Sequence, residues 1–269
     1  MAPWITADEI INYYETKSAE YFSNFVLGLP YVGEGNQVTP DIIYRNCTTE
    51  INTQERVVIG CDSGLKKHYV VGNKNGIFYA GIATDWKEIE ELLAKYERSI
   101  AVIDALPDLT EPRRLREKYP GRVFLCHYAR DRKTFQLIRW GKNEEAGNVT
   151  VDRNRMMQMV IDDFANKKIP LQGSQDTWSE FESHFATLYR VTKVDTLGVP
   201  QNVWETSSGL DHFVHACCYW RTGMDRFSND GGKIFTGQPN EFPTAPTLLP
   251  NDTVIWKPKF IMPEKEDDN

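Results

Sequence analysis

Val57-Val58-Ile59-Gly60-Cys61-Asp62-Ser63-Gly64 is the stretch that decides the fold of this chain of 269 residues. A short apolar run that ends in turn-forming residues predicts a buried β-strand. Asp62 closes that strand, where a carboxylate is costly to bury without a positive partner. The stretch Ile100–Asp104 repeats the pattern, with Asp104 as its last residue. We therefore expect a cation between the two carboxylates.

The sequence around these two runs predicts a mixed sheet. The expected elements are three strands joined by tight turns, a helix, a strand, a second helix and a fifth strand, at residues 57–62, 68–72, 77–83, 85–96, 99–105, 111–119 and 123–128. The first three strands should be antiparallel, and the later crossovers should make parallel pairs. This order is that of the ribonuclease H-like fold, in which the first and fourth strands are neighbours. Asp62 and Asp104 should then lie together, although 42 residues separate them.

The flanking regions divide the chain into three parts. Residues 1–55 predict a lead-in helix over 5–28, with a capping box from Thr6 to Glu9, and an extended segment over 36–55. Residues 56–226 form the main domain, and the Pro- and Gly-rich, acidic residues 227–269 predict an extended tail. The later part of the main domain predicts a protruding hairpin, two helices, two short strands and a last helix, at 134–140 with 149–151, 153–166, 178–189, 190–195, 203–205 and 208–226.

Composition excludes several classes of protein. Charged residues make up 26% and hydrophobic residues 41% of the chain, which is usual for a globular domain with a sizeable core. No apolar run approaches the ~18–20 residues that span a bilayer, and the N-terminus has no signal-peptide core. The five cysteines show no CxxC spacing, so we expect reduced thiols and neither a zinc site nor a disulfide framework.

Positive charge is concentrated in one segment, although the net charge of the chain is −7. From Arg113 to Arg155 there are twelve Lys and Arg residues against five Asp and Glu residues, a local charge of +7. A basic segment on an acidic body fits a track for a phosphate backbone, but solvated helix and hairpin faces give the same pattern. The candidate contacts to nucleic-acid phosphates are Lys66, Lys67, Arg130, Arg132, Lys133, Arg153 and Arg155.

Three carboxylates are the candidate metal ligands and catalytic groups. Asp211, at the start of the last predicted helix, joins Asp62 and Asp104. Acids that converge from distant parts of a chain suit a two-metal phosphodiesterase site, because divalent ions need hard oxygen ligands. Each acid also has a simpler interpretation. Asp62 and Asp104 could only end their strands in turns, and Asp211 could complete a capping box that Ser208 begins.

Two histidines follow Asp211 on the last predicted helix. His215 is one helical turn from Asp211 and can face the same site, whereas His212 points about 100° away. Either imidazole can bind a metal or transfer a proton, and either can equally be a partly buried structural side chain. The remaining histidines have no evident partner in the sequence, so we expect structural roles for His68, His127 and His184.

These segments resemble the C-terminal nuclease domain of the large terminase subunit of tailed bacteriophages. The resemblance covers most of residues 15–226 and rests on the stretches 57–64, 101–107 and 211–219. The stretch 21–31 is similar to the segment that joins motor and nuclease in that family. The resemblance implies a ribonuclease H-like α/β domain with a terminase-type hairpin insertion, and an ATPase motor that is missing here.

The resemblance also implies an activity. It implies a metal-dependent endonuclease that cuts concatemeric viral double-stranded DNA during genome packaging. Two Mg²⁺ or Mn²⁺ ions would be held by Asp62, Asp104 and Asp211, with His212 or His215 nearby. The implied partners are double-stranded DNA, an ATPase motor domain, the small terminase subunit and the portal protein. The implied location is the cytoplasm of the infected bacterium, with no membrane contact.

Two other functions fit parts of the sequence. Actin-like and sugar-kinase ATPases have a related fold and also begin with a strand, an Asp and a Gly, which residues 61–64 match loosely. Neither a GxxxxGK[ST] motif nor a second Gly-rich phosphate loop follows in this sequence. A degenerate nuclease fold could instead serve as an inactive interaction module of the packaging motor.

Overall fold

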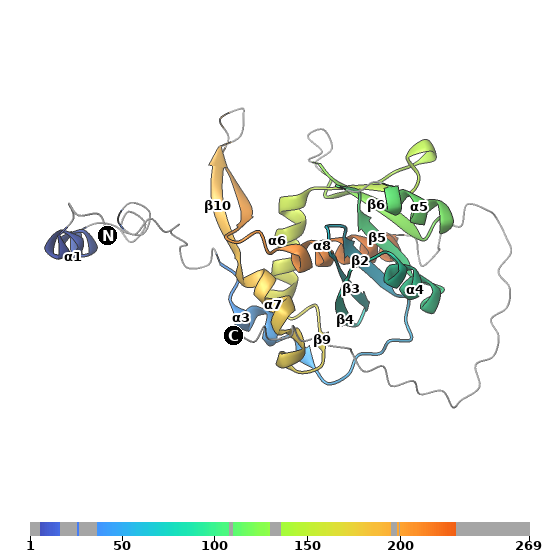
Figure 1. The fold of residues 1–269 in the computed structure, drawn as a ribbon, viewed down its shortest axis with the longest axis horizontal. Helices are drawn as coiled ribbons and strands as arrows, with labels where there is room; N and C mark the ends of the chain where they lie inside the picture. Colours follow the sequence, from blue (N-terminus) through green and yellow to red (C-terminus); the bar gives the residue numbers. More distant parts are fainter. Residues whose placement is uncertain are drawn as a thin grey trace, which may run out of the picture. The chain divides into compact units, whose positions relative to one another are not determined.

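A computed structural model describes residues 6–16, 26, 37–107, 110–129, 136–194, 198 and 200–229 (Figure 1). Its main feature is a mixed sheet with the strand order β1-β9-β4-β3-β2-β5-β6-β8-β7. The chain is thus an α/β protein, as the sequence predicts. Among the helices of this described part, none is long and apolar enough to cross a membrane.

The centre of the sheet has the ribonuclease H-like arrangement. Its strands are β2 (Val58–Asp62), β3 (Lys67–Asn73), β4 (Gly76–Ala83), β5 (Ile100–Asp104) and β6 (Val123–Tyr128). β3 and β4 continue from β2 as an antiparallel meander, and β5 and β6 add to its other side in parallel. The prediction of a mixed sheet, with the first and fourth strands as neighbours, is confirmed.

The strand register brings three polar residues together. In the parallel pair β2 and β5, Cys61 is the partner of Ile103, so Asp62 and Asp104 are the next residues along both strands. In the antiparallel pair β2 and β3, Asp62 is the partner of His68. One end of the sheet centre therefore carries an imidazole and two carboxylates on three adjacent strands.

The edges of the sheet differ from the prediction in two places. The hairpin of β7 (Ile138–Trp140) and β8 (Asn148–Val151) does not protrude, because β8 pairs in parallel with β6 and buries Val149 and Val151 in the core. On the opposite edge, β1 (Cys47–Thr48) pairs with β9 (Leu171–Gln172). The expected extended segment 36–55 contains a short helix, α3 (Pro40–Tyr44), with Pro40 in its first turn and Ile43 fully buried.

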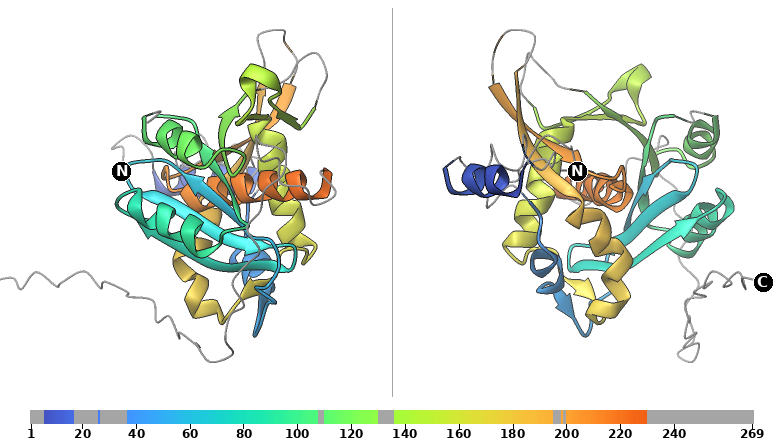
Figure 2. Two further views of the ribbon diagram at one scale, coloured as in Figure 1. Left: turned by 90° about the vertical axis from the view of Figure 1, so that its right-hand side faces the viewer. Right: turned by 60° about the vertical axis from the view of Figure 1, so that its left-hand side comes forward.

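Helices cover both faces of the sheet, as Figure 2 shows. α4 (Lys87–Lys95) and α5 (Thr110–Lys118) pack on the face that carries the odd-numbered residues of β2 and β5. The even-numbered residues face α6 (Arg153–Ala165), α7 (Ser179–Ala186) and α8 (His212–Asn229). The alternation of the strand side chains therefore gives the sheet two separate apolar cores.

Helix α8 lies unusually close to β2. A Cβ atom at Gly60 would come within 2.1 Å of the Ala216 carbonyl oxygen and 2.3 Å of the Trp220 backbone nitrogen. Only glycine fits at this position, because any other side chain would push the helix away from the strand. The glycine in the middle of the Val57–Gly64 stretch therefore sets the distance between Asp62 and the first turn of α8.

The first turn of α8 also differs from the prediction. The helix begins at His212 and not at the predicted residue 208, so the alternative interpretation of Asp211, as part of a capping box that Ser208 begins, is wrong. Gly209 has φ +75°, which is left-handed, and the backbone N–H of Leu210 donates to the hydroxyl of Ser208 in a tight turn. The carbonyl of Asp211 accepts the first helical hydrogen bond, from the N–H of His215. The Asp211 side chain is therefore available for contacts outside the helix.

The remaining described elements are peripheral to the sheet centre. β10 (Leu188–Val194) and β11 (Pro200–Thr206) form an antiparallel hairpin of their own. Short 3-10 helices cover Asn143–Glu145 and Gln175–Trp178. α1 (Ala7–Thr16) has the predicted capping box, in which Thr6 and Glu9 exchange side chain–backbone hydrogen bonds. Apart from residue 26, the rest of the lead-in helix lies outside the described residues, and so does the expected tail over 227–269 beyond the last turn of α8.

Candidate active site

The candidate site lies where the carboxyl ends of β2, β5 and β6 meet the N-terminus of α8. Asp62 and Asp104 belong to the even-numbered series of their strands, which faces α8. His68 on β3 and Tyr128 on β6 belong to the same series. The fold therefore gathers polar side chains from four strands and one helix at one end of the sheet.

Asp62 is the centre of a group of three potential metal ligands. Its Oδ2 lies 2.8 Å from Nδ1 of His212, which is the first residue of α8. One ligand atom each of Asp62, His68 and His212 lies within 4.8 Å of the other two. Asp62 and His68 are buried, with 7% and 6% of their surface exposed, while His212 is half-buried. The group is thus open to solvent on the side of His212.

The histidines around Asp62 differ in charge. The rings of His68 and His212 stack with centroids 4.5 Å apart. Burial, and then the charge of His212, lowers the pKa of His68 to about 4, so its imidazole is neutral at pH 7. The hydrogen bond to Asp62 raises the pKa of His212. One neutral and one more basic imidazole therefore lie next to the same carboxylate.

His184 supports this group without joining it. Its Nδ1 accepts a hydrogen bond from the backbone N–H of Phe213, which is in the first turn of α8 and has no partner within the helix. Burial lowers the pKa of His184 to about 4, which keeps the accepting nitrogen unprotonated. Its structural role thus agrees with the sequence-based expectation, and it holds the first turn of α8 in place.

Asp104 is the second carboxylate of the site. It is half-buried, and its Oδ1 accepts a hydrogen bond from the backbone N–H of Leu106. Burial raises the pKa of Asp104, and the nearby charge of Asp62 adds to this effect. The adjoining loops are tied together, because the Ser63 hydroxyl donates to the Leu106 carbonyl. Two acids with a mutual repulsion therefore share one end of the sheet.

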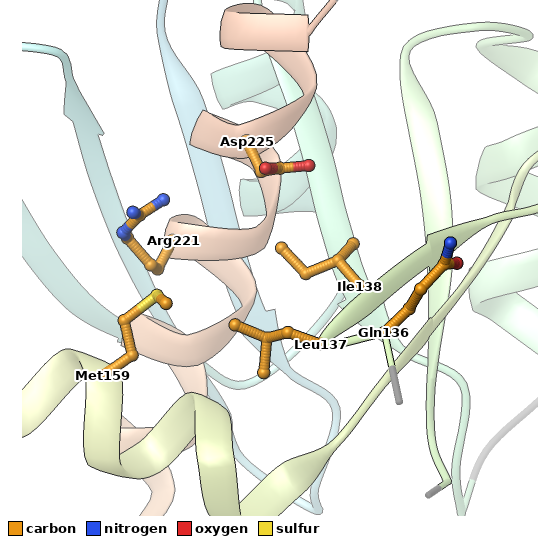
Figure 3. A pocket seen from close by; sticks show the side chains of 6 residues that line it. All are labelled: Gln136, Leu137, Ile138, Met159, Arg221 and Asp225. Carbon is orange, nitrogen blue, oxygen red and sulfur yellow. The ribbon is translucent and has the colours of Figure 1, made fainter. Parts of the chain in front are cut away.

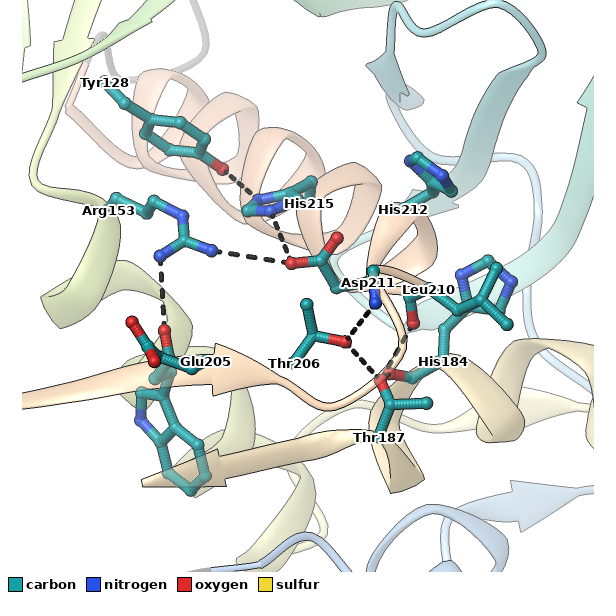
Figure 4. A network of polar contacts seen from close by, with 12 residues as sticks. Tyr128, Arg153, His184, Thr187, Glu205, Thr206, Leu210, Asp211, His212 and His215 are labelled. Carbon is teal, nitrogen blue, oxygen red and sulfur yellow. Dashed lines mark hydrogen bonds and ion pairs between the residues drawn. The ribbon is translucent and has the colours of Figure 1, made fainter. Parts of the chain in front are cut away.

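Asp211 belongs to a second network, shown in Figure 4. Its Oδ2 lies 3.2 Å from Nε2 of His215 and 3.5 Å from the Arg153 guanidinium. The other ring nitrogen of His215 is 3.0 Å from the Tyr128 hydroxyl. Burial opposes the ionisation of Asp211, but the hydrogen bond to His215 and the charges of His215 and Arg153 together lower its pKa. Its negative charge is thus already compensated by protein groups.

The two candidate histidines of α8 are divided between the networks. His215 lies one turn from Asp211 and contacts it, as the helical spacing predicts. His212 points elsewhere and contacts Asp62, and in Figure 4 its ring lies apart from the dashed lines. The expectation that His68 has only a structural role missed its contact with the site. The signal was the tight hairpin after Asp62, whose antiparallel pairing places His68 opposite that residue.

The candidate phosphate contacts lie in different environments. Lys66 is exposed in the β2–β3 turn, and the Lys67 ammonium lies over the ring of Trp86, 5.4 Å from its centroid. Arg153 is held by Asp211 and also donates to the carbonyl of Trp204. Arg155 is exposed at the start of α6. Arg130, Arg132 and Lys133 lie outside the described residues. Contact of these residues with DNA stays a prediction.

Comparison with solved structures finds similarity to large terminases of bacteriophages. The large terminase nuclease from thermophilic phage G20c shares 9% identity with this chain at a TM-score of 0.44, over 65% of this chain and 85% of the other. The large terminase of a second thermophilic bacteriophage, in complex with ATP-gamma-S, shares 13% identity at a TM-score of 0.42, and the match covers 80% of this chain and 52% of the other. The nuclease domain of the large terminase from bacteriophage SPP1, with bound Mn, shares 14% identity at a TM-score of 0.37, and the match covers 70% of this chain and 98% of the other. Comparison with family models and with curated proteins found no match.

These are structures of the family that the sequence motifs resemble. The chain spans about half the length, 52%, of the terminase in complex with ATP-gamma-S. The identities are low, so the assignment of the fold rests on the strand order and register of this chain, and the chemistry of the site follows from its own residues.

Two hollows open near α6. One, of about 320 Å³, adjoins the Asp211 network and is lined by Tyr128, Ala129, Asp152, Arg153, Asn154, Arg155 and Asn202. The other, of about 270 Å³, lies between β7, α6 and α8 and is lined by Gln136, Leu137, Ile138, Met159, Arg221 and Asp225 (Figure 3). None of the predicted site residues lines the second hollow, whereas Arg153 and Arg155 line the first.

Proposed function

We propose that this chain is a metal-dependent endonuclease that hydrolyses phosphodiester bonds of double-stranded DNA. One observation carries the proposal. Asp62 and Asp104 end neighbouring parallel strands in register, on the face that meets the imidazole-bearing first turn of α8. Two carboxylates placed in this way repel each other, and a cation between them removes the repulsion. Carboxylates that hold cations beside a phosphate are what phosphodiester hydrolysis requires.

The donor set fits divalent cations. Asp62 would bridge two ions and Asp104 would hold one of them. The second ion would be held by His212 or, alternatively, by Asp211 with His215 nearby. The raised pKa of Asp104 reflects a buried acid next to another acid, an arrangement that a bound cation stabilises. When bound, such ions activate a water molecule and stabilise the leaving oxygen. Mg²⁺ and Mn²⁺ are the expected ions, because both accept oxygen ligands.

The remaining residues of the site position these ligands. The contacts of Asp211 with His215 and Arg153, and of His215 with Tyr128, fix the start of α8 and with it His212. The charge of Arg153 compensates Asp211, so this acid adds little repulsion against an approaching phosphate. The exposed Lys66 and Arg155 would contact phosphates of the bound DNA.

The biological setting is part of the proposal. The sequence motifs at 57–64, 101–107 and 211–219 resemble terminase nucleases, which supports cleavage of concatemeric viral DNA during genome packaging. The partners would then be an ATPase motor domain, the small terminase subunit and the portal protein, in the cytoplasm of an infected bacterium. The sequence contains no evident base-reading motif, so cleavage should be largely independent of sequence.

Incubation with supercoiled plasmid tests the proposal. Nicked and linear products should form with Mg²⁺ or Mn²⁺ and should be absent with EDTA. Product in EDTA, or no product with either metal over a range of concentrations, would contradict the proposal. ATP hydrolysis measured in parallel separates the nuclease from the ATPase alternative. Intact plasmid together with unimpaired DNA binding would favour the inactive interaction module.

A further inference from the structure

The imidazole of His68 is a buried group that the proposed nuclease mechanism does not use. Its Nδ1 makes no hydrogen bond of ordinary length and angle among the residues that the structure describes, although the residue is only 6% exposed and the backbone of Lys66 lies near the ring. A buried polar atom without a partner costs about 1–3 kcal/mol, so such atoms usually serve a ligand or an ordered water. In this structure the atom belongs to a residue that lies directly opposite Asp62 in the sheet.

We infer that Asp62, His68 and His212 together bind one divalent transition-metal ion, with His68 as a direct ligand. The inference deepens the proposed function, because it adds a ligand to one of the two proposed ion sites and names the class of ion. Two donors of one zinc-type ion lie at most about 4.4 Å apart, since metal–nitrogen and metal–oxygen bonds are about 2.0–2.2 Å long. Adjacent donors of a tetrahedral ion lie about 3.4 Å apart. The three ligand atoms lie within 4.8 Å of one another, so rotation of the side chains must bring them closer.

The surroundings of the three side chains restrict what can replace His68. Its ring stacks on His212 and meets the edge of Phe213, with a centroid distance of 5.0 Å. His184 cannot take its place, because its Nδ1 accepts from the backbone N–H of Phe213, which leaves the ring proton on Nε2. Asp211 is held by Arg153 and His215. The Asp62 centre thus offers two nitrogen donors and one carboxylate.

This donor set has a preference that an all-carboxylate site lacks. Imidazole suits Zn²⁺, Ni²⁺ and, by its place in the same affinity series, Co²⁺, whereas Mg²⁺ prefers oxygen ligands and gives up its waters reluctantly. His68 should therefore strengthen the binding of Co²⁺ and leave the binding of Mg²⁺ almost unchanged. The ratio of the two affinities measures its role directly and does not depend on DNA cleavage.

The test uses the whole chain, freed of metal by dialysis against EDTA. Co²⁺ binding is followed by visible absorption and Mg²⁺ binding by calorimetry, for wild type, His68→Phe and His127→Phe. Phenylalanine keeps a stacked ring at position 68 but has no ligand atom. His127 is the matched control, since it is half-buried on β6 on the opposite face from Tyr128. Loss of even an indirect partner of a metal ligand costs about 10–100-fold in affinity, so His68→Phe should weaken Co²⁺ binding by at least about 100-fold.

The outcomes separate this inference from the proposed function. Equal Co²⁺ affinity of wild type and His68→Phe overturns the inference. Metal-dependent plasmid cleavage by the wild type would still support the proposed nuclease function in that case. Conversely, a Co²⁺ site that disappears in His68→Phe supports the inference even if no DNA is cut. If His68→Phe does not fold, wild-type proton NMR with Co²⁺ decides. Two shifted imidazole N–H signals support the inference, and one signal overturns it.

Discussion

Asp62 and Asp211 approach the same end of α8 but have opposite kinds of partners. Asp62 has two imidazoles beside it: His212 can give up its proton to a metal ion, and the neutral ring of His68 can offer a lone pair. Asp211 is bound by Arg153, whose guanidinium keeps its charge at any physiological pH, and by His215. An acid whose neighbouring imidazoles can act as ligands is suited to bind metal. An acid paired with a permanent cation is suited to a structural role.

The three acids differ in how their negative charges are compensated. The sequence treats the three acids alike, because each precedes or follows an apolar run. In the structure they differ in the charged groups that lie next to each carboxylate. Asp62 and Asp104 meet each other and imidazoles, so the cation that we propose would lie there. Whether Asp211 also binds metal stays a prediction, and the following variants test the division.

Asp62→Asn should have the largest effect. A ligand proposed to bridge two ions loses its charge for both, so cleavage should fall by at least about a thousandfold. Co²⁺ binding should be lost as well. Plasmid cleavage, Co²⁺ absorption and circular dichroism of the folded variant are the measurements. Asp41→Asn is the control, because Asp41 is an exposed carboxylate on α3 and should behave as wild type. Cleavage by Asp62→Asn at the wild-type rate would reduce Asp62 to a turn residue.

Gly60→Ala should damage both networks at once. Its Cβ would overlap the backbone of α8 at Ala216 and Trp220, so the helix must shift away from β2. Overpacking of a well-packed core costs about 1–3 kcal/mol or more, and here the obstacle is backbone that cannot rotate away. Urea denaturation measures the loss of unfolding free energy. Gly64→Ala is the matched control, since its Cβ would meet only an ordinary contact at 3.4 Å. Equal stability of the two variants would show that α8 is not tightly fixed by Gly60.

Asp211→Asn should affect positioning more than metal binding. It leaves the half-buried Arg153 without its carboxylate, which should cost about 1–2 kcal/mol of unfolding free energy. The rate of cleavage should fall by about 10–100-fold, as it does when a residue that orients a metal ligand without binding the metal is replaced. Co²⁺ affinity should stay near the wild-type value. Loss of Co²⁺ binding as complete as in Asp62→Asn would make Asp211 a ligand and end the distinction between the two acids.

The smallest effect is expected from the basic segment, which should touch neither acid. Replacing Arg130, Arg132 and Lys133 with Ala should weaken DNA binding and flatten its salt dependence by about one unit for each lost phosphate contact. Co²⁺ affinity should not change. DNA affinity across a salt titration is the measurement. Superimposable titrations of the variant and the wild type would mean that these residues form a solvated face and that the DNA track lies elsewhere.

Much of the fold could be predicted because its signals are local. Apolar runs closed by turn residues gave the strands at 57–62 and 100–104, and the order of elements gave the sheet. Predictions failed where a distant contact decided the outcome. The segment 134–151 has the local pattern of a free hairpin, and its place in the sheet depends on pairing with β6. The start of α8 depends on the left-handed Gly209, which local capping rules do not anticipate.

The sequence by itself determined the strands that end in Asp62 and Asp104, and it placed Asp211 beside the last helix, because apolar runs and the turns that follow them are local patterns. Only the tertiary structure decided how these acids are partnered. The register of β2 with β3 placed His68 beside Asp62, and the packing of α8 turned His212 toward one acid and His215 toward another. Electrostatic interactions depend on distances of a few ångströms between elements, which neighbouring residues in a sequence do not specify.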